Sequence, residues 1–312
     1  MSEILGLVAL SHSPFATLLP PDGPEQPGGR FLAEAARLSE AVARLAPDAV
    51  VVIGPDHFHG NFYDAMPPFL IGVEHAVGFG DFGSRSGPLP VAGELAWALH
   101  DGLTGAGFDL SLSYALTVDH GLVQSYEMVC GVGTDIPLVP LVVNTAAPPL
   151  PTMDRCIAFG RALGDALRGA GGTGRVLVIA SGGLSHWLPT NDPRDPAMAE
   201  ARRHAVIHGR EALRAFAVER EDRVRAMGGD PYAHVNGAWD RWFLKQLGTG
   251  ESGPIAALGD AGLEERAGSG GHEIRTWLIG HAAVRAPLVW TAYEPVPEWI
   301  TGMGLGATFE VH

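Results

Sequence analysis

The chain has 312 residues, of which 46% are hydrophobic and 18% are charged, so it can bury a large core and shows no bias towards disorder. Its 21 basic and 35 acidic residues give a net charge of −14 at pH 7. Such a surface repels phosphate backbones and anionic lipids, so neither nucleic acid nor a membrane is expected as a partner. The only two cysteines, Cys130 and Cys156, exclude a disulfide framework and a cysteine-rich metal site.

The amino terminus lacks the basic patch of a signal peptide, and the apolar run at residues 4–10 is too short to span a membrane. No apolar stretch elsewhere reaches the roughly eighteen residues that a spanning helix needs. We therefore expect a cytoplasmic protein.

Short apolar runs alternate with helical patterns along the chain. The runs are rich in Val, Ile and Leu, which is typical of parallel strands buried on both faces. The predicted strands cover residues 4–10, 49–53, 137–143 and 176–180, and the predicted helices cover residues 31–45, 156–167 and 198–216. Residues 248–271 are predicted to form a partly irregular connection into a last helix that begins near His272.

This alternation predicts an α/β fold with a mostly parallel central sheet and helices on both of its faces. The Pro- and Gly-rich stretches at residues 19–29, 146–151 and 169–174 are loops too short to link domains. Residues 1–312 are therefore predicted to form a single domain.

Three of the 13 histidines directly follow predicted strands: His12, His57 and His186. Ligands of open α/β sheets bind beyond the carboxyl ends of the strands, so these side chains can converge on one crevice. A single histidine after a strand is usually a capping or hydrogen-bonding residue. For three in equivalent positions, a metal or acid–base site is an equally good interpretation. His120 is a fourth candidate, because Asp119 or a neighbour can orient its ring.

Glu273 follows a glycine run at the predicted start of the last helix. One interpretation is a carboxylate that the helix dipole favours there. The other is a metal ligand, because two imidazoles and one carboxylate leave half of an octahedron open, which suits Fe(II) binding an organic chelate and dioxygen. A zinc ion on the same ligands would instead hold a hydrolytic water. The ligand types alone do not separate iron from zinc.

Seven short segments match, in order, the motifs of one enzyme family. They are Leu10-Ser11-His12-Ser13-Pro14, Pro55-Asp56-His57 continuing through residues 62–69, Val118-Asp119-His120-Gly121, and residues 80–84, 181–186, 272–277 and 297–300. In these segments the chain resembles the class III, or LigB-type, extradiol dioxygenases, and within them the group that cleaves 2,3-dihydroxyphenylpropionate.

The resemblance implies a role for each matched residue. His12, His57 and Glu273 would hold Fe(II), and His120 and His186 would act as the acid–base pair. The implied reaction is the opening of a 3-substituted catechol by O2 beside its two hydroxyls, in the catabolism of aromatic compounds. The family fold is a single α/β domain that commonly forms homo-oligomers.

Two alternatives stay open beside this interpretation. One is a Zn(II) hydrolase on the same ligands, and the other is a metal-binding, non-catalytic member of the fold. The joint presence of His120 and His186 favours an enzyme, because a binding module needs neither. His59 and Trp187 depart from the family pattern, and we expect both to line the substrate pocket.

Overall fold

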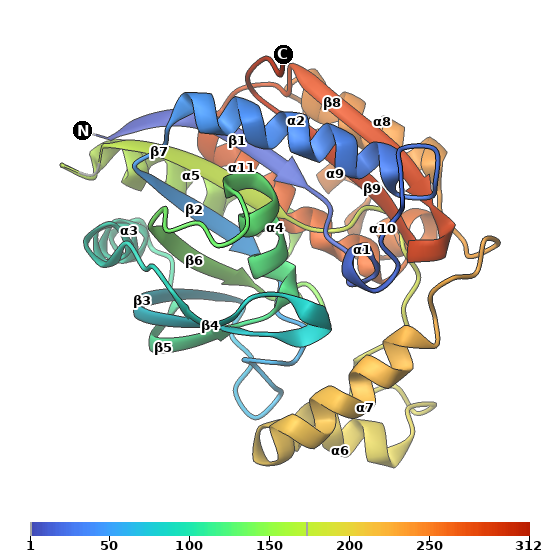
Figure 1. The fold of residues 1–312 in the computed structure, drawn as a ribbon. Coiled ribbons are helices and arrows are strands. Elements are labelled where there is room, and N and C mark those ends of the chain that lie inside the picture. The colour runs from blue at the N-terminus through green and yellow to red at the C-terminus, as the bar shows by residue number, and fades with distance from the viewer. Residues whose placement is uncertain (1, 173) are drawn as a thin grey trace.

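A nine-stranded sheet forms the centre of the computed structural model, which describes residues 2–172 and 174–312 (Figure 1). Along the sheet the strand order is β4-β3-β6-β2-β7-β1-β9-β8, and β5 pairs with β3 beside this path. The strands are β1 (Glu3–Leu10), β2 (Ala49–Gly54), β3 (Phe69–Phe79), β4 (Ser86–Leu89), β5 (Ser111–Val118), β6 (Leu138–Val143), β7 (Arg175–Ser181), β8 (Trp290–Val296) and β9 (Thr301–Ala307).

The four predicted strands are confirmed as β1, β2, β6 and β7, which lie side by side at the centre of the sheet. They pair in parallel, with Ile53 of β2 opposite Ala180 of β7. The expected mostly parallel sheet is mixed, because β3, β4, β8 and β9 join it through antiparallel pairs. Only a short turn separates β8 from β9, and a connection that short can join only antiparallel neighbours.

Helices cover both faces of the sheet, as expected. Along β2, Val51 and Ile53 face one core layer while Val50 and Val52 face the other, as the alternation of side chains in a strand requires. The first layer packs against α3 (Gly93–Gly105), α5 (Met153–Gly169), α8 (Gly237–Gly248) and α11 (Ile274–Val284), and the second packs against α2 (Gly29–Leu45) and α4 (His120–Cys130).

The helix expected over residues 198–216 is two helices, α6 (Glu200–His208) and α7 (Leu213–Arg225), joined by the short 3-10 turn η2 (Gly209–Ala212). Figure 1 shows this pair extending away from the sheet, and we call residues 200–225 the arm. A β-carbon at Gly209 would lie only 2.3 Å from the ring of Phe62, so the close approach there requires glycine. Phe58 and Phe62 pack with Val206 and Phe216 and so attach the arm to the loop after β2.

Residues 248–271 are more regular than expected, because α9 (Gly253–Ala256) and α10 (Gly259–Ala267) form there before the 3-10 turn η3 (Gly270–Glu273). The remaining short elements are α1 (Phe15–Leu18), η1 (Asp81–Gly83) and η4 (Pro297–Trp299). Among the described residues, no helix combines the length and the apolar character that crossing a bilayer would require.

Candidate metal centre

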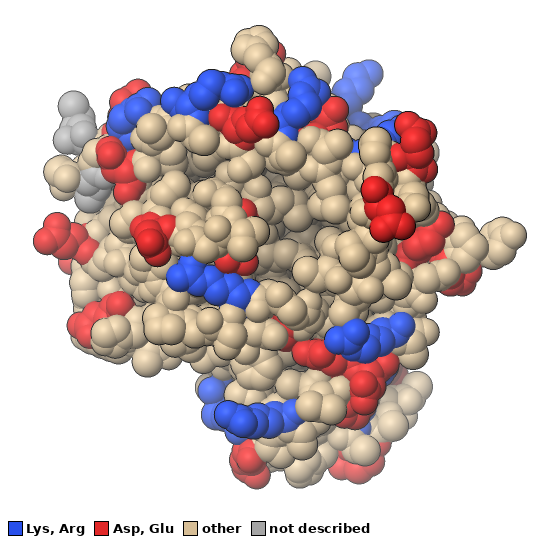
Figure 2. All heavy atoms as spheres, in the orientation of Figure 1, with Lys and Arg blue, Asp and Glu red and all other residues tan. Residues whose placement is uncertain are grey.

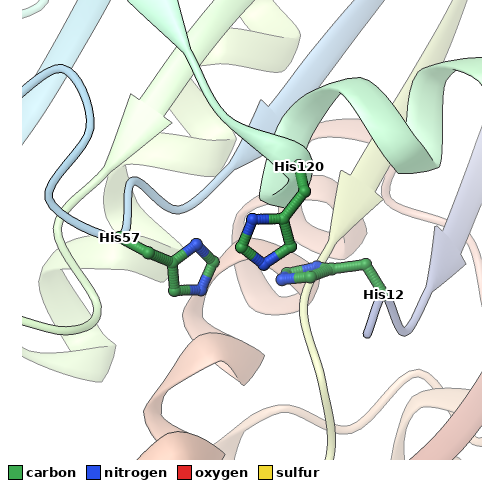
Figure 3. Close-up of side chains that lie close together, drawn as sticks. All are labelled: His12, His57 and His120. Carbon is green, nitrogen blue, oxygen red and sulfur yellow. The ribbon is translucent and has the colours of Figure 1, made fainter. Parts of the chain in front are cut away.

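All five residues singled out in the sequence meet at the carboxyl edge of the central strands. His12 follows β1, His57 follows β2 and His186 follows β7, whereas His120 begins α4 and Glu273 ends η3. Figure 3 shows the rings of His12, His57 and His120 pointing toward one another. Their centroids are 4.6 to 5.5 Å apart, and their nearest ligand nitrogens all lie within 4.8 Å of one another.

The Glu273 carboxylate faces three of these imidazoles. Its Oε1 lies 3.1 Å from Nε2 of His57 and 3.7 Å from Nε2 of His186, and its Oε2 lies 3.6 Å from Nε2 of His12. The backbone N–H of Gly183 donates to Oε2 at 2.6 Å. Burial opposes ionisation of Glu273, but the surrounding histidines outweigh it and hold its pKa well below the usual range. The centre therefore contains a buried, ionised carboxylate.

His12 and His57 are oriented by groups that contact their other ring nitrogens. Nδ1 of His12 lies 2.9 Å from the Ser181 hydroxyl, and Nδ1 of His57 lies 3.1 Å from Oδ2 of Asp119. With Nδ1 engaged, both rings turn Nε2 toward Glu273. Outer partners of this kind fix the tautomer and direction of metal-binding histidines.

His120 and His186 are held in the same way. Nδ1 of His120 lies 2.5 Å from Oδ2 of Asp81, and Nδ1 of His186 lies 2.9 Å from the carbonyl of Leu184. The sequence suggested Asp119 or a neighbour as the residue that orients His120, but Asp119 contacts His57 and caps α4 through the Gly121 N–H. Asp81 lies in the matched segment at residues 80–84, and its role could not be predicted because it depends on a contact across 39 residues of chain.

His59 and Trp187 were expected to line the substrate pocket, but both lie outside the cavities at the centre. His59 is buried behind the centre, with Nδ1 3.2 Å from Asp119 and Nε2 3.6 Å from Asp81. Its Nε2 has no hydrogen-bond partner among the described residues. The ring of Trp187 packs on His234 at 4.1 Å. Neither residue borders the two cavities that meet at the centre.

His12 and His57 differ in their affinity for protons. Burial dominates at His12 and lowers its pKa to about 3. Burial also acts against a charge on His57, but Asp119 and Glu273 outweigh it and raise the pKa of His57 to about 10. Without a metal ion, a proton on His57 therefore lies between two carboxylates. The centre is built to hold positive charge.

These residues fit a divalent metal ion. They offer a buried ionised carboxylate, two imidazoles whose Nε2 atoms face it, and outer partners on both rings. No Lys or Arg of the described chain forms an ion pair with Glu273. Iron and zinc both accept this donor set.

Two cavities open onto the centre. The first is lined by His12, His57, His120, His186 and Glu273, and its other walls are mostly apolar. The second borders His57 and Glu273 from the side of the loop at residues 145–150 and 188–191. All four histidines therefore border the space that a small organic molecule in the first cavity would occupy.

Comparison with known proteins places this centre in a functional context. Residues 6–304 match the family described as the catalytic LigB subunit of aromatic ring-opening dioxygenase. A 2,3-dihydroxyphenylpropionate/2,3-dihydroxicinnamic acid 1,2-dioxygenase of Klebsiella pneumoniae is 36% identical, over 98% of this chain and 99% of that protein. The protein of the same name from Paraburkholderia xenovorans is 38% identical, over 96% of this chain and 95% of its own length.

A solved structure shares the fold. An uncharacterised protein of Escherichia coli K12 superposes with a TM-score of 0.53, over 96% of this chain and 98% of that one, at 14% sequence identity. At this identity the likeness supports the α/β architecture alone.

Proposed function

The chain belongs to the LigB family of aromatic ring-opening dioxygenases, and on that premise we propose that it cleaves a 3-substituted catechol beside its two hydroxyls with Fe(II) and O2. His12, His57 and Glu273 would hold the iron. The observation that carries this assignment is the buried Glu273 carboxylate, which faces Nε2 of both histidines at the inner end of a cavity.

The proposed substrate carries a carboxylate on its side chain. The similar proteins from Klebsiella and Paraburkholderia are named for 2,3-dihydroxyphenylpropionate and the related cinnamic acid. They align with nearly the whole of this chain, so a catechol of the same class is the natural first substrate to test.

Iron held by His12, His57 and Glu273 would activate a bound catechol and dioxygen for reaction with each other. The remaining steps need proton transfers, for which His120 and His186 line the same cavity as Glu273. A carbonyl only accepts hydrogen bonds, so Nδ1 of His186 carries a proton and its Nε2 faces the cavity. Asp81 orients His120 similarly. Each Nε2 can therefore accept a catechol proton when neutral, or donate one to the departing oxygen when charged.

Anaerobic reconstitution with Fe(II), followed by oxygen and a panel of catechols, tests the proposal. We expect one dioxygen consumed per catechol and a yellow product whose mass is that of the substrate plus O2. A Zn(II)-loaded sample should consume no oxygen. A hydrolysis product formed without oxygen uptake would favour the zinc hydrolase, and iron binding without turnover would favour the non-catalytic module.

The remaining expectations have separate tests. We expect homo-oligomers, which sedimentation of the purified chain would detect, and a cytoplasmic location, which cell fractionation would detect. One cooperative unfolding transition would support a single domain over residues 1–312.

A further inference from the structure

Arg220 of the arm lies where the two cavities meet. Both cavities are lined by Arg220 together with His57, Leu188 and Glu273. Of the described residues that line either cavity, Arg220 is the only arginine or lysine. A negatively charged group on a molecule bound at the centre can therefore meet one guanidinium, and no ammonium group, among the described residues that line the cavities.

The guanidinium of Arg220 is only partly engaged by the protein. Its Nη1 donates to the backbone carbonyl of His57 and lies 3.2 Å from Nδ1 of His59. Among the described residues, neither Nε nor Nη2 has a hydrogen-bond partner, and no carboxylate forms an ion pair with Arg220. Two sets of N–H donors are left for a ligand.

None of the nearby carboxylates bonds to Arg220. Asp119, Asp81 and Asp56 are near enough to interact electrostatically with Arg220, but none of them forms an ion pair with it. Asp119 and Asp81 bond to histidines, and Asp56 accepts hydrogen bonds from backbone N–H groups of the following loop. Among the described residues, Arg220 thus has no carboxylate partner of its own, and its free N–H groups are available to a bound carboxylate.

Two other arginines of the arm, unlike Arg220, pair with carboxylates. Arg210 pairs with Asp64 at 2.7 Å, and Arg223 pairs with Glu219 at 2.7 Å on the surface. Arg223 lies on the same helix, less than one turn from Arg220, and provides a matched control.

We infer that Arg220 binds the side-chain carboxylate of the catechol, a role that rests on the proposed function. Its bond to the carbonyl of His57 holds the guanidinium beside the candidate metal centre instead of on it. Leu188, Val224 and Met227 line the same cavity and offer apolar surface to the carbon atoms that link ring and carboxylate. The planar guanidinium can engage both carboxylate oxygens.

The test compares 2,3-dihydroxyphenylpropionate with 3-propylcatechol, which replaces the carboxylate by an apolar group. Anaerobic affinity for the iron-loaded protein and kcat/KM are measured for both compounds. We expect the parent to prefer the carboxylate, and Arg220→Met to reduce this preference by about 10- to 100-fold. Arg220→Lys should retain part of the preference, because it keeps the positive charge but loses the planar guanidinium that can engage both carboxylate oxygens. Arg223→Gln should keep the parental ratio.

A parental ratio in Arg220→Met, or an equal loss of both compounds in both Arg220 variants, would overturn the assignment. So would a parent that binds the two catechols equally, a result that needs no variant to fold. Failure of the proposed function has a different signature, in which the parent consumes no oxygen with either catechol. The anaerobic affinities would then still decide whether Arg220 recognises the carboxylate.

Discussion

The edge of the central sheet and the arm contribute to the same cavity but are built differently. At the sheet edge His12, His57 and Glu273 are buried, and a neighbouring group holds each of them in place. The arm has few buried side chains, and Figure 2 shows acidic and basic groups next to one another on its surface. A small apolar cluster around Phe62 and Phe216 attaches it.

This difference separates two tasks. Residues fixed by strand ends and second partners can keep the sub-ångström geometry that a reaction needs. A segment held by few contacts can change its side chains without disturbing that geometry. We therefore expect changes at the sheet edge to alter the reaction, and changes on the arm to alter which catechol binds.

The largest effect is expected from Glu273→Gln, which removes the charge and keeps the shape. Stoichiometric iron and all ring cleavage should be lost, a larger effect than the roughly 10–100-fold that follows loss of an outer partner. His57→Ala should behave alike, whereas Arg223→Gln on the arm should retain full iron. Metal analysis of the purified variants gives the answer. Full iron content in His57→Ala would refute its role as a ligand and direct attention to His59.

His120→Gln and His186→Gln should retain iron but lower kcat by about 10²–10⁴-fold, because each removes a proton-transfer group from the transition state. The parental pH–rate profile should be bell-shaped, and each variant should lose one limb. Loss of iron from His120→Gln would instead make this histidine a ligand, in keeping with its closeness to His12 and His57. A normal kcat in His186→Gln would leave that residue a purely structural role.

Asp81→Asn and Asp119→Asn form a matched pair of variants. One changes the partner of a proposed acid–base histidine, and the other changes the partner of a proposed iron ligand. Asp81 contacts His120, so its replacement should lower kcat by about 10- to 100-fold and leave iron in place. Asp119 contacts His57, so its replacement should weaken iron binding by about the same factor. Identical defects in the two variants would mean that the centre acts as one undivided network.

Metal affinity should rise with pH by about tenfold per unit, until the pH approaches the apo-state pKa of His57. That pKa is raised to about 10 by Asp119 and Glu273 against the effect of burial, so below it an ion must displace a proton from His57. Calorimetry of anaerobic metal binding in buffers of different ionisation enthalpy would count the released proton. An affinity that does not change with pH would contradict the prediction.

The smallest effect is expected where the arm meets the loop after β2. Arg210 donates to Asp64 and holds the pKa of that carboxyl below its usual range. Arg210→Gln should lower the free energy of unfolding by only about 0.2–1 kcal/mol, because the pair is largely exposed. A lowered carboxyl pKa stabilises the folded state above the unfolded pKa of about 3.9, and this contribution disappears as the pH falls through the folded value. Denaturant titration at neutral and acidic pH would measure it.

The elements that could be predicted from the sequence are those whose signal lies within a short stretch of residues. β2 and β7 are buried on both faces, and their unbroken runs of Val and Ile were sufficient to predict them. β5 and β8 are partly exposed and have no such run, so neither was expected. The arm was expected as one helix because its composition is helical throughout, and the packing of Phe62 against Gly209 is a long-range contact.

The candidate site shows the same limit. Histidines after strands are visible in the sequence because the sheet edge is a general property of α/β folds. The pairing of Asp81 with His120, and the position of Arg220 beside His57, depend on segments brought together across 39 and 163 residues. No spacing rule reaches across such distances.

The place of β1 in the sheet has a consequence for biosynthesis. β1 carries His12 at its end and lies between β7 and β9, so that Leu10 pairs with Ser181 on one side and with Leu305 on the other. During synthesis β1 precedes both of its neighbours. It has no strand to pair with until β7 (Arg175–Ser181) or β9 (Thr301–Ala307) has been made. Glu273 is also synthesised late, so a truncated nascent chain cannot assemble the proposed ligand set. Iron loading should therefore follow translation, and a stalled chain should expose an unpaired apolar strand to chaperones or to aggregation.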